Sequence, residues 1–488
     1  MRSRRTLLLA LLLTLVPGSL AAQRGDTLTA AMRAVLQRPA VQRAHWGIEV
    51  VDVATGESLL RHNADRLFIP ASNTKLVVAA AAAHYLAPDF RYTTTLHATG
   101  PVELGVLRGD LVIRGTGDPT ISGRYYQGNM LAVWEALADS LARLGVRRID
   151  GGVVADESHW DSDYVRGDWE NYDLLWWYAA PVAALGFNDN SIDFSVAAGA
   201  VGAPAAISWK PETTHFTFVN RSITVPAGRA SSIDFTRIAG TDTIVAYGQI
   251  PADAARRTEY FAVADPARYA AAVFAETLQR RGIGILLPEL RVLRDTAESN
   301  TLLSGASVLA RHRSVPLPQV IRPVLQTSQN WFAEQLLKTI GREAGGAGSW
   351  ARGLSMERRF LIDIVGMDSL AFRLRDASGL SAGNLMTPRA LAQLARYIAR
   401  TPRMQPVLSA MPVAGASTGS MRTRLTDLNG RVTAKTGSIG NVDALTGFIT
   451  TSSGRRVAFS IVVNNSGISS AAMRPIIDDV VRAIAAAL

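Results

Sequence analysis

The chain has 488 residues, a formal net charge of +10 and 48% hydrophobic residues, so it is long enough for two or three domains and too apolar for a disordered chain. It contains no cysteine, which excludes disulfides, thiolate catalysis and cysteine-ligated zinc. The basic residues are scattered and the seven histidines lack metal-ligand spacing, so we expect no nucleic-acid partner, no metal and no cofactor.

The N-terminus has the pattern of an export signal. Three arginines within residues 1–5 precede the apolar run 6–16, and small residues at 17–22 supply a cleavage site. The apolar run is too short to span a bilayer. We therefore predict a signal peptide at 1–22 and an exported protein, periplasmic or otherwise, with no stable membrane span. Loss of the three arginines lowers the net charge to +7, which would suit an anionic wall polymer or a membrane face.

The first part of the mature chain predicts a helix, a hairpin and a buried helix. Helical periodicity covers 27–37, and the β-rich segment 45–53 is followed by a turn and a second strand at 58–61. From Ser72 to about Leu86 the sequence is apolar on all sides. This pattern predicts a central, buried helix.

The middle third is rich in short β segments. Strands are predicted at 91–98, 111–114 and 152–155, around one clear helix at 130–144. The later elements are β segments at 192–196, 206–209, 217–220, 233–237 and 243–247, a helix at 266–281 and a strand at 290–293.

From about Leu302 helices dominate, and three strong strands and a closing helix complete the chain. The strands at both ends of the chain need partners, so we predict one α/β domain built from both ends, with the middle third inserted. The predicted helices are 317–326, 329–340, 350–365, 388–400 and 470–488, and the strands are 430–435, 444–450 and 457–463.

Ser72 and Lys75 stand at the start of the buried helix. Residues three apart share a helix face, so the lysine can reach the serine hydroxyl. The N–H groups of the first turn favour negative charge at Ser72, and burial would lower the pKa of Lys75. The pattern predicts a serine nucleophile with a lysine base, the alternative being an N-cap serine beside a solvated lysine.

Lysine is scarce in this chain. It occurs only at positions 75, 210, 338 and 435, and the other 47 basic residues are arginines. Arginine cannot be deprotonated in proteins, so a retained lysine indicates a place where a removable proton matters. Ser72 and Lys75 form the only Ser-x-x-Lys pair.

Two further stretches have catalytic chemistry. In Ser328-Gln329-Asn330, between two predicted helices, a hydroxyl and an amide can face one cleft, with an N-cap as the alternative. Lys435-Thr436-Gly437-Ser438 ends a predicted strand, where glycine permits close approach and the polar groups suit a carboxylate, with an ordinary strand end as the alternative. Ser-x-x-Lys, Ser-x-Asn and Lys-Thr-Gly in this order form the active-site set of penicillin-binding proteins and β-lactamases.

A competing motif is present at Gly415–Gly419, which matches the Gly-x-Ser-x-Gly nucleophile elbow. That motif requires a strand before it and a helix after it. The flanking sequence here is typical of a loop, so we do not expect Ser417 to be a nucleophile.

With its three motifs, the chain resembles the low-molecular-mass class C penicillin-binding proteins of the penicillin-binding protein 4 type. These are the D-Ala-D-Ala carboxypeptidases and endopeptidases of peptidase family S13. The resemblance implies a multi-domain α/β fold. A penicillin-binding-protein/β-lactamase-like transpeptidase domain, with an antiparallel sheet flanked by helices, would carry two nested, β-rich insertions in the gap of 253 positions between Lys75 and Ser328. The implied domains are 23–92 with 300–488, 93–187 with 257–299, and 188–256. Other matching stretches are Gly109-Asp110-Leu111, Gly117-Asp118-Pro119, Tyr178-Ala179-Ala180-Pro181, Asn188-Asp189-Asn190, the stretch 376–381 and Leu445-Thr446-Gly447-Phe448.

The resemblance implies a role for each catalytic residue. Ser72 would attack the carbonyl between two D-alanines and form an acyl-enzyme, and Lys75 would take its proton. Ser328 would relay that proton to the leaving amine. Asn330 would orient Lys75 and the substrate amide.

The third motif is implied to bind the substrate. Lys435, with the hydroxyls of Thr436 and Ser438 on either side of Gly437, would hold the terminal carboxylate. Backbone N–H groups of Ser72 and Ser438 would form the oxyanion hole. Water would then release the acyl group.

The resemblance also implies a site for the diaminopimelate side chain of the peptide. Asp156 matches the acidic residue of the inserted domain that binds its amine, and Ser378 lies in the matching stretch 376–381. The chain departs from the family at Ala377, usually glycine, and at Ala382, usually arginine. The side-chain carboxylate would then lose its bidentate partner, unless another arginine serves or the third residue of the substrate is amidated or different. Asp156 could equally be a structural turn residue.

The expected function is that of an exported serine carboxypeptidase or endopeptidase that acts on peptidoglycan peptides and is acylated by β-lactams. The alternatives are a serine β-lactamase or esterase on the same motifs, or a catalytically inactive wall-binding module. The sequence leaves open the balance of the two cleavages and the oligomeric state.

Overall fold

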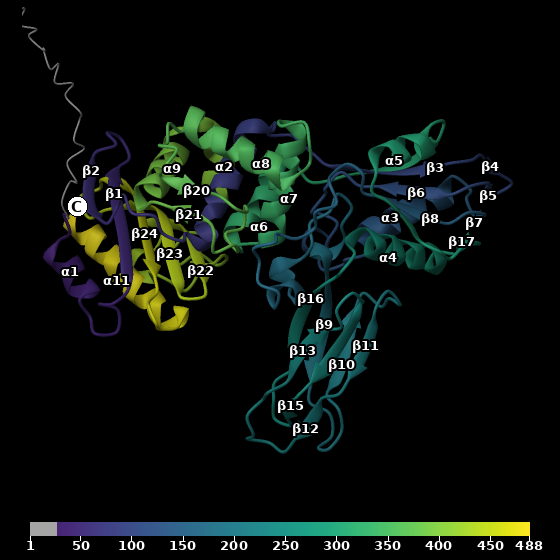
Figure 1. Cartoon of the computed structure of the whole chain (residues 1–488), viewed down its shortest axis with the longest axis horizontal. Coiled ribbons are helices and arrows are strands. Elements are labelled where there is room, and N and C mark those ends of the chain that lie inside the picture. Colours follow the sequence, from purple (N-terminus) through teal and green to yellow (C-terminus); the bar gives the residue numbers. More distant parts are fainter. Residues whose placement is uncertain (1–26) are drawn as a thin grey trace, which may run out of the picture.

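The structure, a computed structural model, describes residues 27–488, so the predicted signal peptide at 1–22 lies outside the described residues. Figure 1 shows an α/β part formed by both ends of the chain, a second α/β part formed by its middle, and a β-rich part that projects below the second. No helix in this described range is both long enough and apolar enough to cross a membrane.

The two ends of the chain meet in one antiparallel sheet. Its strands are β1 (His45–Asp52), β2 (Ser58–His62), β22 (Val432–Ile439), β23 (Val442–Thr450) and β24 (Arg456–Asn464). The order is β2-β1-β24-β23-β22, and β1 pairs with β24 along its whole length. The prediction that the first and last strands share one sheet is confirmed.

Alternating residues of this sheet face two helical layers. Phe459 and Ile461 join a core with α1 and α11, whereas Ala458 and Val462 face the larger core of the other helices. Figure 1 places α2, α6 and α7 between the sheet and the second part. The helices are α1 (Ala30–Leu36), α2 (Lys75–Tyr85), α6 (Leu317–Gln326), α7 (Asn330–Glu343), α8 (Trp350–Arg359), α9 (Pro388–Arg400), α10 (Gln405–Ala410) and α11 (Ser470–Ala487).

Helix α2 is the central element of this part. Every residue from Lys75 to Ala83 is buried, as the apolar sequence predicts. The preceding segment, Ala71–Thr74, is a 3₁₀ turn, so the α-helix begins at Lys75 rather than at Ser72. The alanine-rich sequence has small side chains, which lets α6 and α7 pack closely against it.

Short elements connect these helices to the sheet. The predicted helix 350–365 is interrupted, because α8 ends at Arg359 and a π-helical turn, Phe360–Ile364, follows it. A two-stranded ribbon, β20 (Phe372–Arg373) and β21 (Leu385–Met386), encloses the stretch 374–384.

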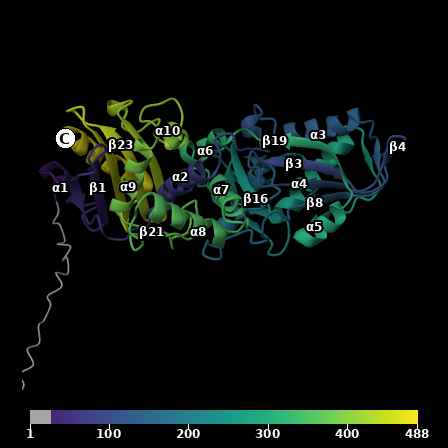
Figure 2. The ribbon, with the colours of Figure 1, turned by 90° about the horizontal axis from the view of Figure 1, so that it is seen from above.

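The second part is a five-stranded sheet with the order β18-β8-β6-β3-β19. Helices α3 and α4 share a core with residues on one face, including Leu96 and Ile113, and the opposite face packs against Leu302 and Leu303 of α5. Figure 2 shows α3 and α5 on opposite sides of this sheet. The elements are β3 (Thr93–Ala98), β6 (Leu111–Arg114), α3 (Ala132–Arg143), β8 (Val153–Asp156), α4 (Pro266–Arg280), β18 (Arg291–Leu293), α5 (Thr296–Leu303) and β19 (Ser307–Arg313), with a smaller sheet of β4 (Val102–Glu103), β5 (Val106–Leu107), β7 (Arg148–Ile149) and β17 (Gly284–Ile285).

The sequence pattern predicts neither α5 nor β19. Strand β19 pairs with β3 from Ser307 to Arg313. The resemblance implies that the second domain ends at residue 299, whereas this sheet continues beyond that residue. The strand is a half-exposed edge with a polar sequence, which gives only a weak β signal. We propose that the chain returns to the first domain near residue 314.

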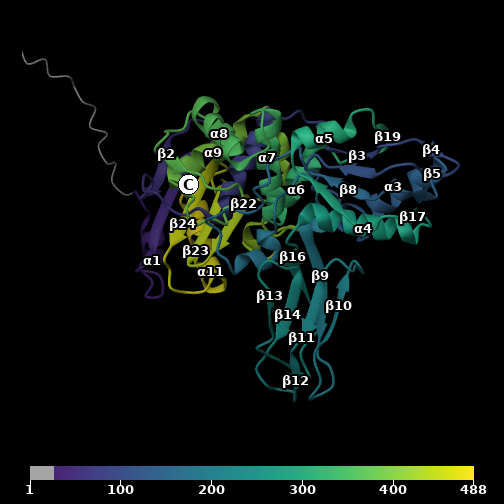
Figure 3. The same cartoon turned by 45° about the vertical axis from the view of Figure 1, so that its right-hand side comes forward.

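The β-rich part contains eight strands in three small sheets, β10-β9-β16, β11-β14-β13 and β12-β15. Five of them are predicted from the sequence, and β12, β15 and β16 are not. Phe194 and Phe261 belong to the same core as the second part, and Figure 3 shows the strands projecting from it. The strands are β9 (Ser191–Ala197), β10 (Ala206–Lys210), β11 (Thr217–Asn220), β12 (Ile223–Val225), β13 (Asp234–Arg237), β14 (Thr243–Tyr247), β15 (Gln249–Pro251) and β16 (Arg257–Ala262).

Candidate active site

Ser72 and Lys75 lie together at the start of α2. The Lys75 side chain is completely buried, and its Nζ lies 2.9 Å from Ser72 Oγ. The same Nζ donates hydrogen bonds to Asn330 Oδ1 and to the Ser378 carbonyl oxygen, both at 2.6 Å. Two acceptors therefore hold the lysine amine beside the candidate nucleophile.

The environment of Lys75 favours its neutral form. Burial lowers the pKa of Lys75 from 10.5 to about 7, and the carboxylates of Asp376 and Glu334 oppose this shift. Near neutral pH a large fraction of Lys75 is then a free amine, which can accept a proton from the Ser72 hydroxyl.

A second buried lysine faces the same site from strand β22. Lys435 Nζ donates to Ser328 Oγ at 2.8 Å and to the Thr436 carbonyl oxygen at 2.6 Å. Burial lowers the pKa of Lys435, and the charge of Lys75 acts in the same direction. Ser328 adopts a φ of +61°, which costs about 1–2 kcal/mol in a residue with a Cβ. Such strain in a motif residue indicates a functional constraint.

Asn330 connects this site to the inserted part of the chain. It is the first residue of α7, and its Nδ2 donates to the Tyr178 carbonyl oxygen at 2.7 Å. The next residue, Trp331, donates its indole N–H to the Pro181 carbonyl oxygen at 3.0 Å. The start of α7 thus fixes the loop around 178–181 against the lysine.

The motif residues open onto a cleft of about 550 Å³, a size typical of ligand sites. Ser72, Ser328 and Asn330 are among its lining residues. Acidic side chains from the inserted part line the cleft as well, and Ala382 is exposed to it. The other lining residues are Asp168, Glu170, Asp173, Trp177, Tyr178, Thr327, Gly379, Leu380, Ser438, Ile439 and Gly440.

Two glycines allow other segments to reach the Ser72 turn. A Cβ at Gly379, which has a φ of +79°, would lie 1.9 Å from the Ala71 carbonyl oxygen. A Cβ at Gly437 would lie 2.9 Å from the Pro70 carbonyl oxygen and 3.1 Å from the Ser72 nitrogen. The glycine of the Lys-Thr-Gly motif therefore permits close approach, as predicted from its type.

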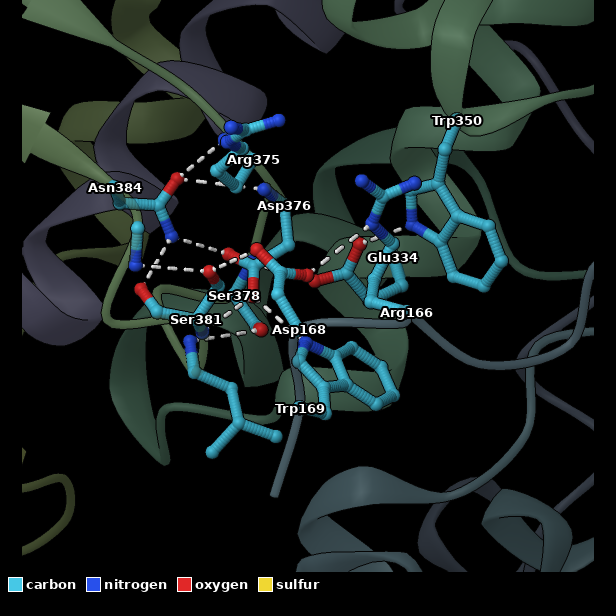
Figure 4. A network of polar contacts seen from close by, with 12 residues as sticks. Arg166, Asp168, Trp169, Glu334, Trp350, Arg375, Asp376, Ser378, Ser381 and Asn384 are labelled. Atoms are coloured by element: carbon cyan, nitrogen blue, oxygen red, sulfur yellow. Dashed lines mark hydrogen bonds and ion pairs between the residues drawn. The ribbon is translucent and has the colours of Figure 1, made fainter. Parts of the chain in front are cut away.

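Buried carboxylates hold the backbone segment that contacts Lys75, and Figure 4 shows their hydrogen-bond network. Glu334 accepts hydrogen bonds from the Ser378 nitrogen at 2.7 Å and from Trp350 Nε1 at 2.8 Å. Asp376 accepts from Trp169 Nε1 at 2.9 Å and from the Gly379 nitrogen at 2.8 Å. These carboxylates fix the backbone of 376–379, whose Ser378 carbonyl holds Lys75.

The structure does not bring Asp156 into the cleft. The Asp156 side chain is completely buried at the end of β8. It accepts from Ser299 Oγ at 2.6 Å, and its other oxygen accepts from the Ser158 nitrogen at 3.0 Å. These contacts support the alternative that Asp156 has a structural role. No geometric observation supports the predicted contact between Asp156 and the substrate.

Ser378 lies at the site, but its side chain has a local role. The side chain is buried, and its Oγ accepts from the Leu380 nitrogen at 3.3 Å. Its carbonyl oxygen, by contrast, contacts Lys75. Ser378 is therefore better described as a residue that positions the lysine than as one that contacts substrate.

Of the residues that follow Lys435, Ser438 lines the cleft. Its hydroxyl donates to Asp443 Oδ1 at 2.7 Å, and Thr436 Oγ1 donates to Ser420 Oγ at 2.9 Å. Ser420 follows the Gly415–Gly419 motif, which forms a partly exposed loop without the strand and helix of a nucleophile elbow. That motif is thus not a second nucleophile.

The remaining lysines lie away from the cleft. Lys338 is buried on α7, where its Nζ donates to Asp161 Oδ1 at 2.7 Å and lies 4.1 Å from the ring centre of Trp350. Lys210 is exposed on β10. Of the four lysines that the sequence singled out by their scarcity, two lie at the site and two do not.

Sequence reasoning missed the residues that support and flank the motifs. Glu334 lies four positions after Asn330, a spacing that places both on one face of α7 and was readable from the sequence. The acidic cluster of Asp168, Glu170 and Asp173 had no comparable signal, because only the fold brings it to the cleft. Between residues 27 and 488, no three histidine or acidic side chains gather as metal ligands.

The sequence profile of the D-Ala-D-Ala carboxypeptidase 3 (S13) family matches residues 28–487. The chain belongs to this family. A D-alanyl-D-alanine carboxypeptidase from Actinomadura sp. (strain R39) is 35% identical over 451 residues, which is 88% of this chain and 80% of the relative. The D-alanyl-D-alanine carboxypeptidase DacB of Haemophilus influenzae is 26% identical over 448 residues, 86% of this chain and 85% of the relative.

The crystal structure of penicillin-binding protein 4 (dacB) from Haemophilus influenzae has the same fold. It superimposes with a TM-score of 0.80 at 23% identity and covers 93% of this chain and 98% of its own. A complex of that protein with a β-lactam superimposes with a TM-score of 0.74 at 22% identity over the same shares of the two chains. The predicted family, α/β fold and serine D-Ala-D-Ala carboxypeptidase activity are confirmed.

Proposed function

We propose that this enzyme cleaves D-alanyl-D-alanine bonds of peptidoglycan peptides through an acyl-enzyme on Ser72. The observation that carries the proposal is the contact between a buried lysine of lowered pKa and the Ser72 hydroxyl, 2.9 Å apart. A hydroxyl is a weak nucleophile unless a base removes its proton. Lys75 is the base within reach.

Acylation then uses the remaining motif residues. Lys75 takes the Ser72 proton as Oγ attacks the carbonyl carbon, and Ser328 passes a proton to the leaving amine. The backbone N–H groups of Ser72 and Ser438 hold the oxyanion, and each such donor is worth about 3–4 kcal/mol in enzymes where it has been measured. Water releases the acyl group in the second step.

The substrate carboxylate is held near Lys435. An approaching carboxylate favours the protonated form of a lysine whose pKa burial has lowered. The charged form of Lys435 would then face the terminal carboxylate, beside the hydroxyls of Thr436 and Ser438. Ser328, bonded to Lys435, lines the same cleft as Ser72.

The side chain of the third peptide residue binds in the acidic end of the cleft. Asp168, Glu170 and Asp173 line it and attract an amine such as that of diaminopimelate, a role that the family resemblance implies for Asp156. The Ala382 wall offers no partner to a neighbouring carboxylate, which favours a side chain that is amidated or lacks that group.

Export and β-lactam binding complete the proposal. The pattern of residues 1–22 supports export to the compartment that contains peptidoglycan, and the β-lactam complex of a relative with the same fold supports acylation of Ser72 by these antibiotics. The rival function on the same motifs is a β-lactamase. It needs a further base that speeds deacylation, and the cleft of the described residues offers acids only on the wall lined by Asp168, Glu170 and Asp173.

The first test measures acylation directly. The purified enzyme should be labelled by a fluorescent penicillin and should release D-alanine from a pentapeptide, and Ser72→Ala should lose both activities. Ser417→Ala is the matched control and should keep both. Rapid multiple turnover of nitrocefin would contradict the peptidase assignment, and labelling that survives in Ser72→Ala would contradict the nucleophile.

A further inference from the structure

A groove lies between the β-rich part and helix α4, apart from the catalytic cleft. Its main cavity has a volume of about 680 Å³, within the range of ligand sites, and shares no lining residue with the cleft. Strand β10 and α4 both line this cavity, and Figure 3 shows β10 below α4.

A second cavity, of about 190 Å³, continues this space along α4. The two cavities share Thr214, Glu276 and Gln279, so together they form one elongated groove. Its far end is lined by apolar residues, among them Leu287 and Leu290. An elongated groove is complementary to a linear ligand of several units rather than to one compact molecule.

Trp209 on β10 gives the groove an aromatic surface. Its ring centre lies 5.2 Å from that of Phe216, 5.7 Å from that of Phe218 and 5.8 Å from that of Phe194. These three rings fix the orientation of the indole, which is only partly buried. A fixed aromatic side chain offers a large apolar contact area together with one N–H donor.

A carboxylate with one unsatisfied oxygen lines the groove opposite this strand, on α4. Glu276 Oε1 accepts hydrogen bonds from Thr213 Oγ1 at 3.1 Å and from the nitrogen and Oγ1 of Thr214 at 2.9 and 3.0 Å. Its Oε2 is buried and has no partner among the described residues. An acceptor in this state is costly, and a donor on a ligand that enters the groove would satisfy it.

The other polar side chains provide both donors and acceptors. Gln279 and Arg280 are exposed and add N–H donors, and Ser208 adds a hydroxyl. Glu212 and Glu276 are the acidic lining residues and Arg280 is the basic one, so the lining lacks the excess of positive charge that an anion requires. A hydroxyl both donates and accepts, so a ligand with many hydroxyls and an apolar face is complementary to this groove.

We propose that the groove binds the glycan strand of peptidoglycan, a saccharide chain whose rings have apolar C–H faces and carry hydroxyl and acetamido groups. The inference rests on the proposed function and extends it to a second part of the same polymer. A sugar ring packs on Trp209, its hydroxyls donate to Glu276, and its oxygens accept from Arg280. The bound glycan holds neighbouring stem peptides near Ser72 and raises their effective concentration at the catalytic cleft.

Direct binding is the first measurement. The probe is a preparation of peptide-free glycan strands, made by amidase digestion of sacculi, and its binding to the full-length mature enzyme is measured by isothermal titration calorimetry. Trp209→Leu removes the aromatic surface and keeps an apolar side chain, and Arg280→Ala removes an exposed donor. Arg229→Ala, an exposed arginine of the β-rich part outside the groove, is the matched control.

Both groove variants should bind the glycan strands more weakly. Trp209→Leu should raise the Kd roughly tenfold or more and Arg280→Ala about threefold, as expected for the loss of an aromatic contact and of one hydrogen bond. The control should bind as the wild-type enzyme does. Labelling by fluorescent penicillin checks that each variant is folded, and should Trp209→Leu fail this check, Arg280→Ala still tests the groove.

A kinetic comparison tests the consequence for catalysis. Release of D-alanine from a soluble pentapeptide without sugar should stay within about twofold in both variants, because the groove and the catalytic cleft share no residue. Release from pentapeptides still attached to the glycan of intact sacculi should fall several-fold, because those peptides lose the effect of the bound strand.

Three results would each overturn the inference: no binding of glycan strands by the wild-type enzyme, unchanged binding in both groove variants, or equal losses on the two substrates. Binding of a free stem peptide that depends on Trp209 would also overturn it, because the groove would then recognise the peptide. Failure of the proposed function has a different signature. Glycan strands would still bind, while the wild-type enzyme would release no D-alanine from the soluble pentapeptide in a Ser72-dependent way.

Discussion

At the scale of single residues, the site depends on two lysines in different environments. Lys75 is held by Asn330 and the Ser378 carbonyl oxygen beside the nucleophile, with two carboxylates behind it. Lys435 is held by Ser328 and its own strand, where burial and the charge of Lys75 both lower its pKa. We therefore propose that the same type of side chain serves as a base at position 75 and as a carboxylate-binding group at position 435.

Replacing the candidate base by arginine tests the first role. Lys75→Arg should reduce acylation by penicillin at least about a hundredfold, because a guanidinium offers no free amine at accessible pH and general-base catalysis contributes about 10²–10⁴-fold. The rate is measured by stopped-flow or gel labelling. Lys210→Arg, on the exposed strand β10, should leave it unchanged, and activity retained by Lys75→Arg would contradict Lys75 as the base.

The pH profile tests the carboxylates behind Lys75. Acylation requires the neutral amine, so its rate should fall as the pH drops below a midpoint near the Lys75 pKa of about 7 and should level off above it. The Glu334 carboxylate favours the charged lysine, so Glu334→Gln should move the midpoint to lower pH. Glu49→Gln, another buried carboxylate, is the control and should not move it.

At the scale of elements, the active site is where three segments approach the Ser72 turn. The turn 71–74 contacts β22 and β23 of the sheet, α7 supplies Asn330, and the stretch 376–379 supplies a carbonyl oxygen. Glycine at positions 379 and 437 removes the Cβ atoms that would separate them. The elements therefore set the distances within the site, and the side chains set its chemistry.

Gly379→Ala tests this close approach. The φ of +79° costs an alanine about 1–2 kcal/mol, and the added Cβ must also displace the Ala71 carbonyl oxygen. We expect lower thermal stability and slower acylation. Gly346→Ala has the same backbone cost, with a φ of +85° and open space around the Cβ. If both variants lost the same stability and both kept the acylation rate, the contact would have no role.

At the scale of the whole molecule, the inserted parts complete the cleft. They supply its acidic wall and the loop that Asn330 holds. Lys338 fastens this insertion to α7 through Asp161 and through the Asp163 carbonyl oxygen, 2.5 Å from its Nζ. The part formed by both ends of the chain contains the candidate nucleophile Ser72 and the two lysines of the site, but it supplies only some of the residues that line the cleft.

Lys338→Met tests whether that attachment positions the acidic wall. The variant keeps the apolar length of the side chain and loses the ion pair, so stability should fall by about 1–3 kcal/mol. The KM for a peptide with a cationic third residue should rise several-fold, while acylation by penicillin stays within about twofold. Lys210→Met is the matched control. An equal fall in penicillin acylation would instead indicate damage to the base.

The sequence by itself identified the candidate nucleophile, the two lysines and the Ser-x-Asn loop that the structure brings together, and it predicted the sharing of one sheet by both ends of the chain. These features have short-range signals: the spacing of three residues on a helix, the scarcity of lysine and the all-round apolar helix 75–85. Only the tertiary structure placed Asp156 within the inserted sheet, brought Asp168, Glu170 and Asp173 to the cleft, and assigned β19 to the second part. Those features depend on contacts between segments far apart in the chain, and exposed acids and polar edge strands have no local pattern that indicates which surface they will face.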